Sequence, residues 1–126
     1  MIINDAIYTH LIRHAGLAAL IVERCYPIRL PQEPTYPAVT YQRISTVPTY
    51  SQDGDSNLDR GRWQFSCWAR THTAAEAVAA QVRTALTTWR ASYGQPAFLE
   101  NQVDFYEPDT DVHHIPVDAI IWWKEE

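Results

Sequence analysis

The chain has 126 residues, of which 46% are hydrophobic and 20% charged, and this balance predicts one globular domain, residues 1–126, and argues against a disordered segment. The net charge of −5 and the lack of a long basic cluster argue against recognition of a nucleic-acid sequence. The longest apolar run, Leu17 to Val22, is too short to cross a membrane, so no membrane partner is expected.

The N-terminal third is predicted to contain a helix and an extended arm. Apolar residues recur at helical spacing over residues 4–18, and Asn4 or Asp5 can cap the first turn. Residues 25–37 contain four prolines, which remove backbone donors, so we expect an arm or sheet edge there and not a central strand. The cysteines at positions 25 and 67 have no metal-type spacing and are expected to be buried thiols of a reducing compartment.

Two strands are predicted around a long loop. Residues 38–47 are rich in β-branched side chains, and residues 59–70 alternate apolar with polar side chains in the two-residue period of a half-buried strand. Residues 48–58 between them are rich in Gly, Asp, Ser and Asn, which is typical of a mobile loop.

The C-terminal half is predicted to contain a helix and two strands. Residues 73–92 carry one apolar face at helical spacing, and Thr73 with Glu76 forms a capping-box pattern. Residues 97–107 and 115–124 alternate as strands, with an acidic turn between them. The whole order predicts an α+β, two-layer domain, with a mainly antiparallel sheet of about four to five strands and two helices packed on one face.

Charge is distributed unevenly along the chain. Residues 1–98 carry nine arginines against seven acidic residues, a balance of +2, whereas residues 99–126 carry one lysine against eight acidic residues, a balance of −7. Such a surface suits head-to-tail association between copies of one chain. An acidic end that simply faces water explains the pattern equally well.

Two tryptophans are candidates for contacts with other proteins. Trp68 and Trp122 fall on the polar faces of their predicted strands, and aromatic residues and arginine are enriched at interfaces. Alternatively, the helices and the arm cover both faces of the sheet and bury both tryptophans. The candidate assembly or partner contacts are Thr49, Tyr50, Gln52, Asp53, Asp55, Asn57, Arg60, Arg62, Trp68, Arg70 and Trp122.

No pattern in the sequence indicates catalysis, a cofactor or a metal. His10 and His14 lie four residues apart, but no further ligand follows nearby in the sequence, so a polar helix edge is the better interpretation. His113 and His114 are neighbours on or near a strand and are expected to point to opposite faces. The paired aspartates lie in turn-rich segments without a cavity that would shift their pKa values. We therefore expect no cofactor and no enzymatic activity.

Several segments resemble a known family. These segments are Tyr26-Pro27, Leu30-Pro31-Gln32, the run from Tyr36 to Ser45, and the run from Trp63 to Ala69 that precedes an alanine-rich helix. They are similar to the tail-completion, or tail terminator, proteins of long-tailed bacteriophages. The order of elements covers nearly the whole chain, and the similar segments include no catalytic residue.

The resemblance implies a role in a virus particle. Such proteins form a ring, usually of six subunits, on the end of the tail tube, where the ring stops tube growth and joins the tail to the head connector. The implied partners are copies of the chain, the tail tube protein and the connector proteins. The implied location is the tail or neck of the virion, after synthesis in the bacterial host cytoplasm. The loop at residues 48–58 is then expected to become ordered at a subunit or tube contact. Another neck or adaptor protein, or a small enzyme, remains an alternative.

Overall fold

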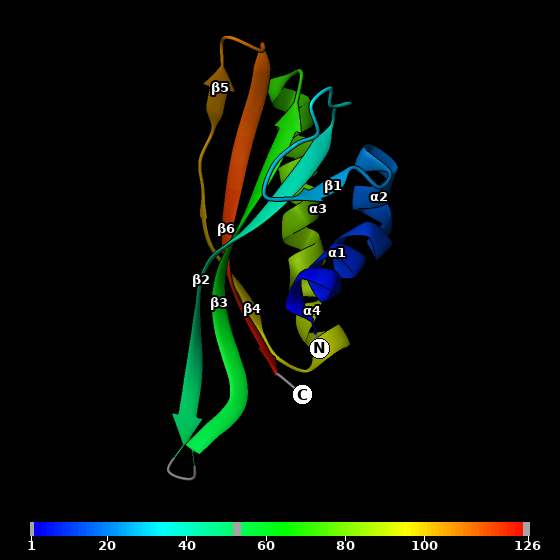
Figure 1. The fold of residues 1–126 in the computed structure, drawn as a ribbon. Coiled ribbons are helices and arrows are strands. Elements are labelled where there is room, and N and C mark those ends of the chain that lie inside the picture. Colours follow the sequence, from blue (N-terminus) through cyan, green and yellow to red (C-terminus); the bar gives the residue numbers. More distant parts are fainter. Residues whose placement is uncertain (1, 52–53, 125–126) are drawn as a thin grey trace.

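A computed structural model describes residues 2–51 and 54–124, which form a sheet of six strands with helices packed on one of its faces (Figure 1). The α+β class and the placement of the helices are therefore confirmed, and the sheet is larger than expected. The elements are α1 (Ile3–Arg13), α2 (Ala15–Ile21), β1 (Cys25–Pro27), β2 (Ala38–Ser51), β3 (Gly54–Ala69), α3 (His72–Thr87), α4 (Trp89–Tyr93), β4 (Ala97–Gln102), β5 (Phe105–Glu107) and β6 (Val112–Lys124).

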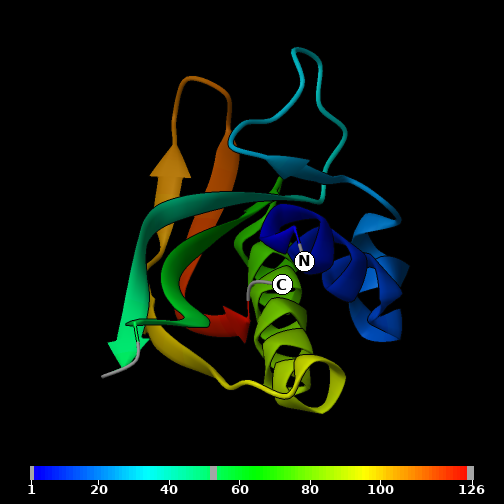
Figure 2. The same ribbon diagram turned by 60° about the horizontal axis from the view of Figure 1, so that its bottom comes forward.

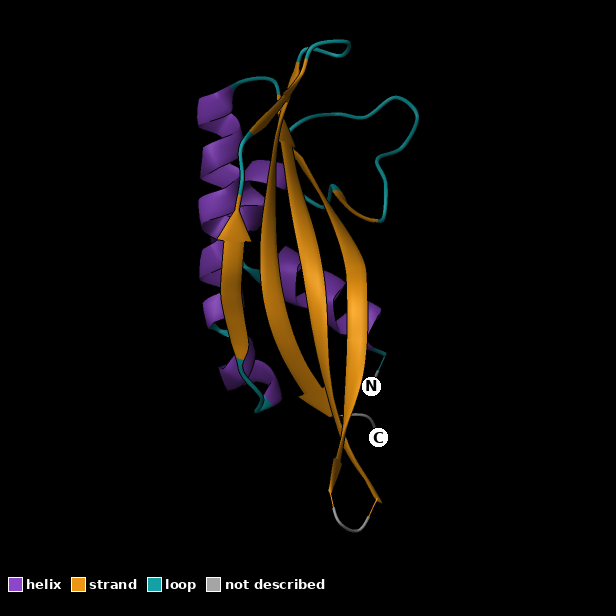
Figure 3. Cartoon of the chain, turned by 90° about the vertical axis from the view of Figure 1, so that its left-hand side faces the viewer, coloured by secondary structure: helices purple, strands orange, loops and turns teal. Residues whose placement is uncertain are grey.

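The sheet is built around three long strands. The strand order is β1-β2-β3-β6-β4, and β5 pairs with β6 beside β4. The pairs among β2, β3, β6, β4 and β5 are antiparallel, whereas β1 runs parallel to the start of β2. Figure 3 shows the long strands side by side, and Figure 2 shows the helices gathered on one side of the twisted sheet. The proline-rich arm thus supplies one short edge strand, as the missing backbone donors predict.

The core lies between the sheet and helix α3. Alternate residues of β3 and β6 face the helices and are almost completely buried, because a pleated strand directs every second side chain to the same face. The largest fully buried side chains include three tryptophans, and each buried large apolar side chain contributes roughly 2 kcal/mol. These core residues are Trp63, Phe65, Val78, Trp89, Ile115, Ile121 and Trp123.

The helices begin and end differently from the prediction. The segment at residues 4–18 is split, because His14 has an extended backbone that ends α1 and precedes α2. Residue Ile2 occupies the N-cap position of α1 without a side-chain hydrogen bond, so the capping role expected for Asn4 or Asp5 is wrong. The cap of α3 is Thr71, whose side chain accepts a hydrogen bond from the backbone N–H of Ala74, and not Thr73.

The loop expected at residues 48–58 is mostly a β-hairpin. β2 continues to Ser51 and β3 starts at Gly54, with the backbones of Tyr50 and Asp55 paired. The prediction of a loop from the composition of this segment was wrong, because main-chain hydrogen bonding between the two strands outweighs the weak strand preference of Asp, Ser and Asn. The strand expected at 97–107 is likewise divided into β4 and β5.

Gly61 provides a test of the packing between β3 and β6. A Cβ atom at this position would lie 2.8 Å from a ring carbon of Trp123 and 2.9 Å from Nε1 of Trp63, and both tryptophans are buried. We expect Gly61→Ala to lower the free energy of unfolding by about 1–3 kcal/mol, as overpacking does, although alanine normally stabilises a strand relative to glycine. Denaturant unfolding followed by tryptophan fluorescence measures this. Gln42→Ala on the exposed part of β2 is the control, and a stabilised Gly61→Ala variant would contradict the packing described.

Candidate assembly surface

The face of the sheet opposite the helices is not covered by a second layer in the described part of the chain (Figure 2). We call it the open face. It carries the alternate residues of β3 and their cross-strand partners, with neighbours contributed by β2 and β4. The open face includes Thr40, Gln42, Ser45, Val47, Arg60, Arg62, Gln64, Ser66, Trp68, Phe98, His114, Asp118, Ile120 and Trp122, of which Thr40, Ser66 and Asp118 are themselves buried.

Trp68 lies at one end of the open face and is half-buried, so the alternative that it is a fully buried core residue is wrong. Its ring stacks on His114 with centroids 3.9 Å apart and an interplanar angle of 6°, and its Nε1 donates to Oγ1 of Thr40 at 3.1 Å. Burial lowers the pKa of His114, although the nearby Glu107 carboxylate opposes the shift. A neutral imidazole therefore packs on the indole near neutral pH.

Arg62 lies at the centre of the open face. Its guanidinium forms ion pairs with Glu100 at 3.1 Å and with Asp118 at 3.2 Å, and Nε2 of Gln64 donates to the same Asp118 at 3.2 Å. Asp118 is 8% exposed, which places a carboxylate in the apolar middle of β6, between Val117 and Ala119. Because a buried charge is costly unless it is paired and hydrogen-bonded, this group fixes the arrangement of β3, β6 and β4. The alternating pattern of residues 115–124 does not reveal these partners, because Arg62 and Gln64 are more than 50 residues from Asp118 along the chain.

The other predicted arginines contact aromatic rings. Arg60 lies over the ring of the half-buried Trp122 at 5.7 Å, at the end of the open face near the hairpin. Arg70 is at the opposite end, where it lies over Tyr36 at 4.8 Å and donates to the backbone oxygen of Thr110 at 2.8 Å. Arg60 and Trp122 therefore present a combined cationic and aromatic surface, whereas Arg70 ties together two loops.

The remaining predicted contacts belong to the hairpin. Oγ1 of Thr49 donates to the backbone oxygen of Leu58 at 2.7 Å, which links β2 to β3. Tyr50 pairs with Asp55 through the backbone, and Asn57 lies on β3 between that pair and Leu58. Gln52 and Asp53 lie outside the described residues.

The histidines on the helical side have structural contacts. Nε2 of His10 lies 2.7 Å from the backbone oxygen of Ala85, and Nε2 of His14 lies 3.1 Å from Oε1 of Gln81. Both contacts tie the N-terminal helices to α3, and burial lowers the pKa of His10. His113 and His114 point to opposite faces as predicted, since His113 contacts the ring of His72 and not that of Trp68.

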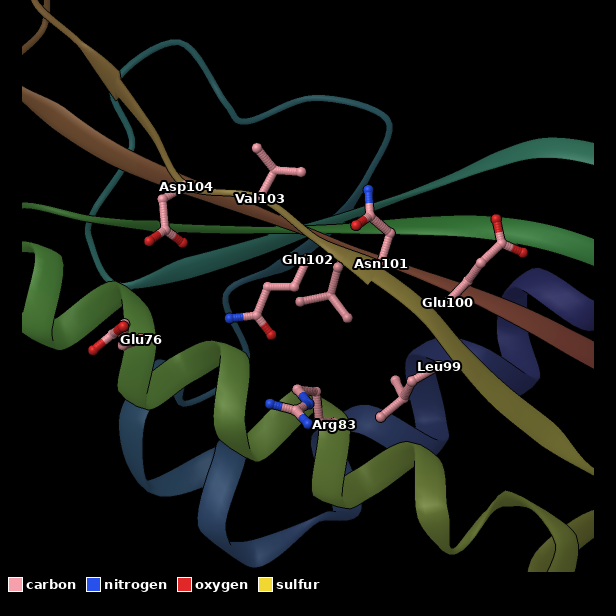
Figure 4. Close-up of a pocket in the computed structure, with 9 residues that line it drawn as sticks. Glu76, Arg83, Leu99, Glu100, Asn101, Gln102, Val103 and Asp104 are labelled. Carbon is pink, nitrogen blue, oxygen red and sulfur yellow. The ribbon is translucent and has the colours of Figure 1, made fainter.

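A polar cleft of about 660 Å³ lies between α3 and β4 (Figure 4). Glu76 and Arg83 approach it from the helix, and Glu100 and Asp104 come from β4 and the segment after it. At one end of the cleft, His72 contacts Asp104 at 3.1 Å and Glu76 at 3.8 Å, and the hydrogen bond to Asp104 raises the pKa of His72. No sequence pattern joins these residues, because Asp104 is 32 residues from His72 along the chain.

Comparison with known families identifies the chain. Residues 5–124 match the family described as "Tail completion protein gp17". The chain belongs to this family. It is therefore a structural component of a phage tail, and the family predicted from the Tyr-Pro and strand segments is confirmed.

The fold of this tail completion protein also occurs in a phage-like particle. It is similar to a chain of the solved structure described as "Virion of native gene transfer agent (GTA) particle", with a TM-score of 0.77 and 17% sequence identity. The similarity covers 94% of this chain and 92% of that chain, and at this identity it shows a shared fold alone. No curated protein matches the chain. Within residues 2–51 and 54–124, no helix is long and apolar enough to cross a membrane.

The ion pairs of Asp118 lead to a stability prediction. Asp118→Ala leaves Arg62 and Gln64 without their shared acceptor, and we expect a loss of about 1–2 kcal/mol, because Arg62 itself is half-exposed and water compensates in part. Urea unfolding measures this. Glu100→Ala, which removes the more exposed partner of Arg62, is expected to cost under about 0.5 kcal/mol. Equal losses in the two variants would contradict the central role of Asp118.

The shifted pKa values of the histidines should make the stability of the fold depend on pH. Burial lowers the pKa of His10 and His114 below the ordinary value of 6.5, so the unfolded chain binds more protons than the folded chain once the pH falls below 6.5. Their contribution is complete above that pH and is lost as the pH falls toward the folded-state pKa. We expect the melting temperature to fall on acidification, and His10→Gln with His114→Gln to flatten this dependence.

His72 supplies the matched control for the pH experiment. Its pKa is raised, so its effect has the opposite sign, and His72→Gln is expected to make the loss of stability at low pH steeper. Calorimetric melting of the wild type, the His10→Gln and His114→Gln double variant, and His72→Gln across about pH 5 to 8 tests both statements. A flatter curve for His72→Gln would contradict the assignment.

Proposed function

We propose that this tail completion protein assembles as a ring of several copies, six in the usual arrangement, on the end of the tail tube. The ring stops growth of the tube and offers a surface to the head connector. The proposal is supported by membership of the family and by the chemistry of the described surfaces, which combine arginine with aromatic side chains at Arg60 and Trp122.

The observation that carries the proposal is the shape of the β2–β3 hairpin. β6 accompanies the hairpin only as far as the pair Leu58–Lys124, and beyond this pair the described structure contains two strands and no third (Figure 1). A two-stranded ribbon gains little stability in water unless it packs against another surface. We therefore propose that the hairpin, with Thr49, Tyr50, Gln52, Asp53, Asp55 and Asn57, contacts the tail tube or an adjacent copy.

The open face is assigned to contacts within the virion. Trp122 and Arg60 adjoin the hairpin, so a partner that binds the hairpin also reaches them. Trp68 and Arg70 lie at the other end of the sheet, where we propose contact with the connector side of the neck. Between these two ends, the ion pairs of Arg62 with Glu100 and Asp118 hold β3, β6 and β4 together at the centre of the open face.

Particles that lack the protein test the role directly. We expect electron microscopy to show tails of uncontrolled length that are not attached to heads, because nothing ends the tube or joins it to the connector. Complementation with the wild-type chain should restore joined particles. Tails of normal length on joined heads would disprove the proposed function. Heads that lack their own neck, beside tails of normal length, would indicate an adaptor of the head instead.

Surface variants test which side of the fold faces the partners. We expect Arg60→Glu combined with Trp122→Ser to reduce incorporation into particles by at least about tenfold, as loss of an interface anchor does. Arg90→Glu, an exposed arginine of α4 on the helical side, is the matched charge reversal and should leave incorporation unchanged. Immunoblots of purified particles give the readout, and thermal melting confirms folding. The reverse pattern would place the contacts on the helical side.

A further inference from the structure

Two margins of the sheet remain unpaired in the described part of the chain. β1 pairs with β2 only through residues 39–41, so the outer edge of β2 is without a neighbouring strand from Gln42 to Pro48. β4 is the last strand at the opposite side of the sheet, and the cleft beside α3 leaves its outer edge accessible. We call these the β2 margin, residues 42–48, and the β4 margin, residues 97–103. Unpaired strand edges present main-chain donors and acceptors to any strand that can approach.

The direction of the strands suits pairing between two copies. β2, β3, β6 and β4 alternate in direction, so β2 and β4 run opposite to each other within one chain. Rotation about an axis roughly parallel to the strands keeps their directions. A copy placed beside the sheet by such a rotation therefore brings its β2 next to β4 as an antiparallel neighbour.

The two margins also lie at the same height on the sheet. Following the pairs across the strands, Leu99 is opposite Ala119, which is opposite Trp63, which is opposite Arg43. The same path joins Phe98 to Ser45. Rotation of a second copy about the axis can therefore bring its β2 margin beside the β4 margin of the first copy with little translation along the axis. A closed ring requires that this translation be absent.

The side chains of both margins are unusually apolar for exposed strand edges. Half of the large hydrophobic residues that are exposed in the described structure lie on these two short segments, and they are Ile44, Val47, Phe98, Leu99 and Val103. Their charges are opposite in sign, because Arg43 is the charged residue of the β2 margin and Glu100 is that of the β4 margin, where it also pairs with Arg62 of its own chain. The two margins thus carry opposite charges and are both apolar. This combination favours a head-to-tail contact between unlike margins over a contact between like margins.

Both margins carry devices that restrict pairing. β2 has an irregularity between Arg43 and Ser45 and a proline at position 48, and β4 has an irregularity between Leu99 and Asn101. Bulges and proline prevent indiscriminate edge-to-edge aggregation. Each margin can therefore pair only with a strand edge whose shape matches its own irregularity.

We infer that the β2 margin of one copy pairs with the β4 margin of the next copy, so that the sheets of the ring form one continuous antiparallel wall. The inference rests on the proposed ring and names the contact that builds it. The occupant of each margin is a second copy of this chain. The open face and the helical face then form the two surfaces of the wall.

Crosslinking in assembled particles tests the contact. Cys25 and Cys67 are buried, and burial raises the pKa of Cys25 to about 12, so the native thiols should not react. Particles made with the variant Ile44→Cys combined with Leu99→Cys are treated with a short bis-maleimide. We expect a ladder of dimers and higher multimers on a denaturing gel, and no dimer from either single variant. Ile2→Cys combined with Ile28→Cys, at exposed positions outside both margins, should give no ladder.

The outcomes separate the contact from the ring itself. A dimer from a single variant would overturn the head-to-tail pairing, as would the absence of a ladder in particles that contain the double variant. If immunoblots find no chain in wild-type particles, the proposed function fails, and the inference fails with it. If wild-type particles contain the chain and need it for joining but the double variant gives no ladder, the proposed function stands and only the inferred contact between margins is wrong.

Co-production with the wild-type chain gives a second test that misfolding cannot imitate. A subunit with Ile44→Lys can still join through its β4 margin but cannot accept the next copy on its β2 margin, so it should block ring closure and lower the yield of joined particles. Leu99→Lys should act in the same way from the other side. The variant with both substitutions can join at neither margin and should be harmless. Equal interference by the double variant, or none by either single variant, would overturn the inference.

Discussion

The packing of α3 on the inner face of β3 and β6 is the constraint from which the rest of the molecule follows. Val78, Val82 and Leu86 of the helix are buried against a strand face that includes Trp63 and Phe65. Because strand side chains alternate, burial of one set forces the intervening residues to the other face. The helices thus stabilise one side of the sheet, and the other side is left without a covering layer in the described part of the chain.

The open face depends on specific pairings more than on burial. Arg62 connects the exposed Glu100 with the buried Asp118, so one guanidinium joins β3, β6 and β4 through ion pairs. The stack of Trp68 on His114 orders the end of the same face away from the hairpin. These contacts restrict the rotamers of the side chains within the single chain, and restricted side chains lose less conformational entropy when they are covered. This property suits a structural component of a phage tail.

Sequence patterns predicted the long elements and failed where the decisive contacts are distant. The helix at α3 and the strands β3 and β6 have clear periods, and the structure contains all three. The hairpin at residues 48–58 was missed, because its composition is typical of a loop while its backbone pairs as a ladder. Trp68 and Trp122 were recognised as unusual, but the partners of Asp118 were not, since Arg62 is 56 residues away from it.

The sequence by itself determined the α+β class, the buried faces of β3 and β6, and the resemblance to tail completion proteins. These properties depend on local periodicity and short segments, which a linear chain displays directly. Only the tertiary structure decided which strand edges stay unpaired, where the helix breaks at His14, and how Asp118 is neutralised. Each of these features depends on which distant residues become neighbours when the sheet packs against the helices. The spacing of residues along the chain does not specify these neighbours.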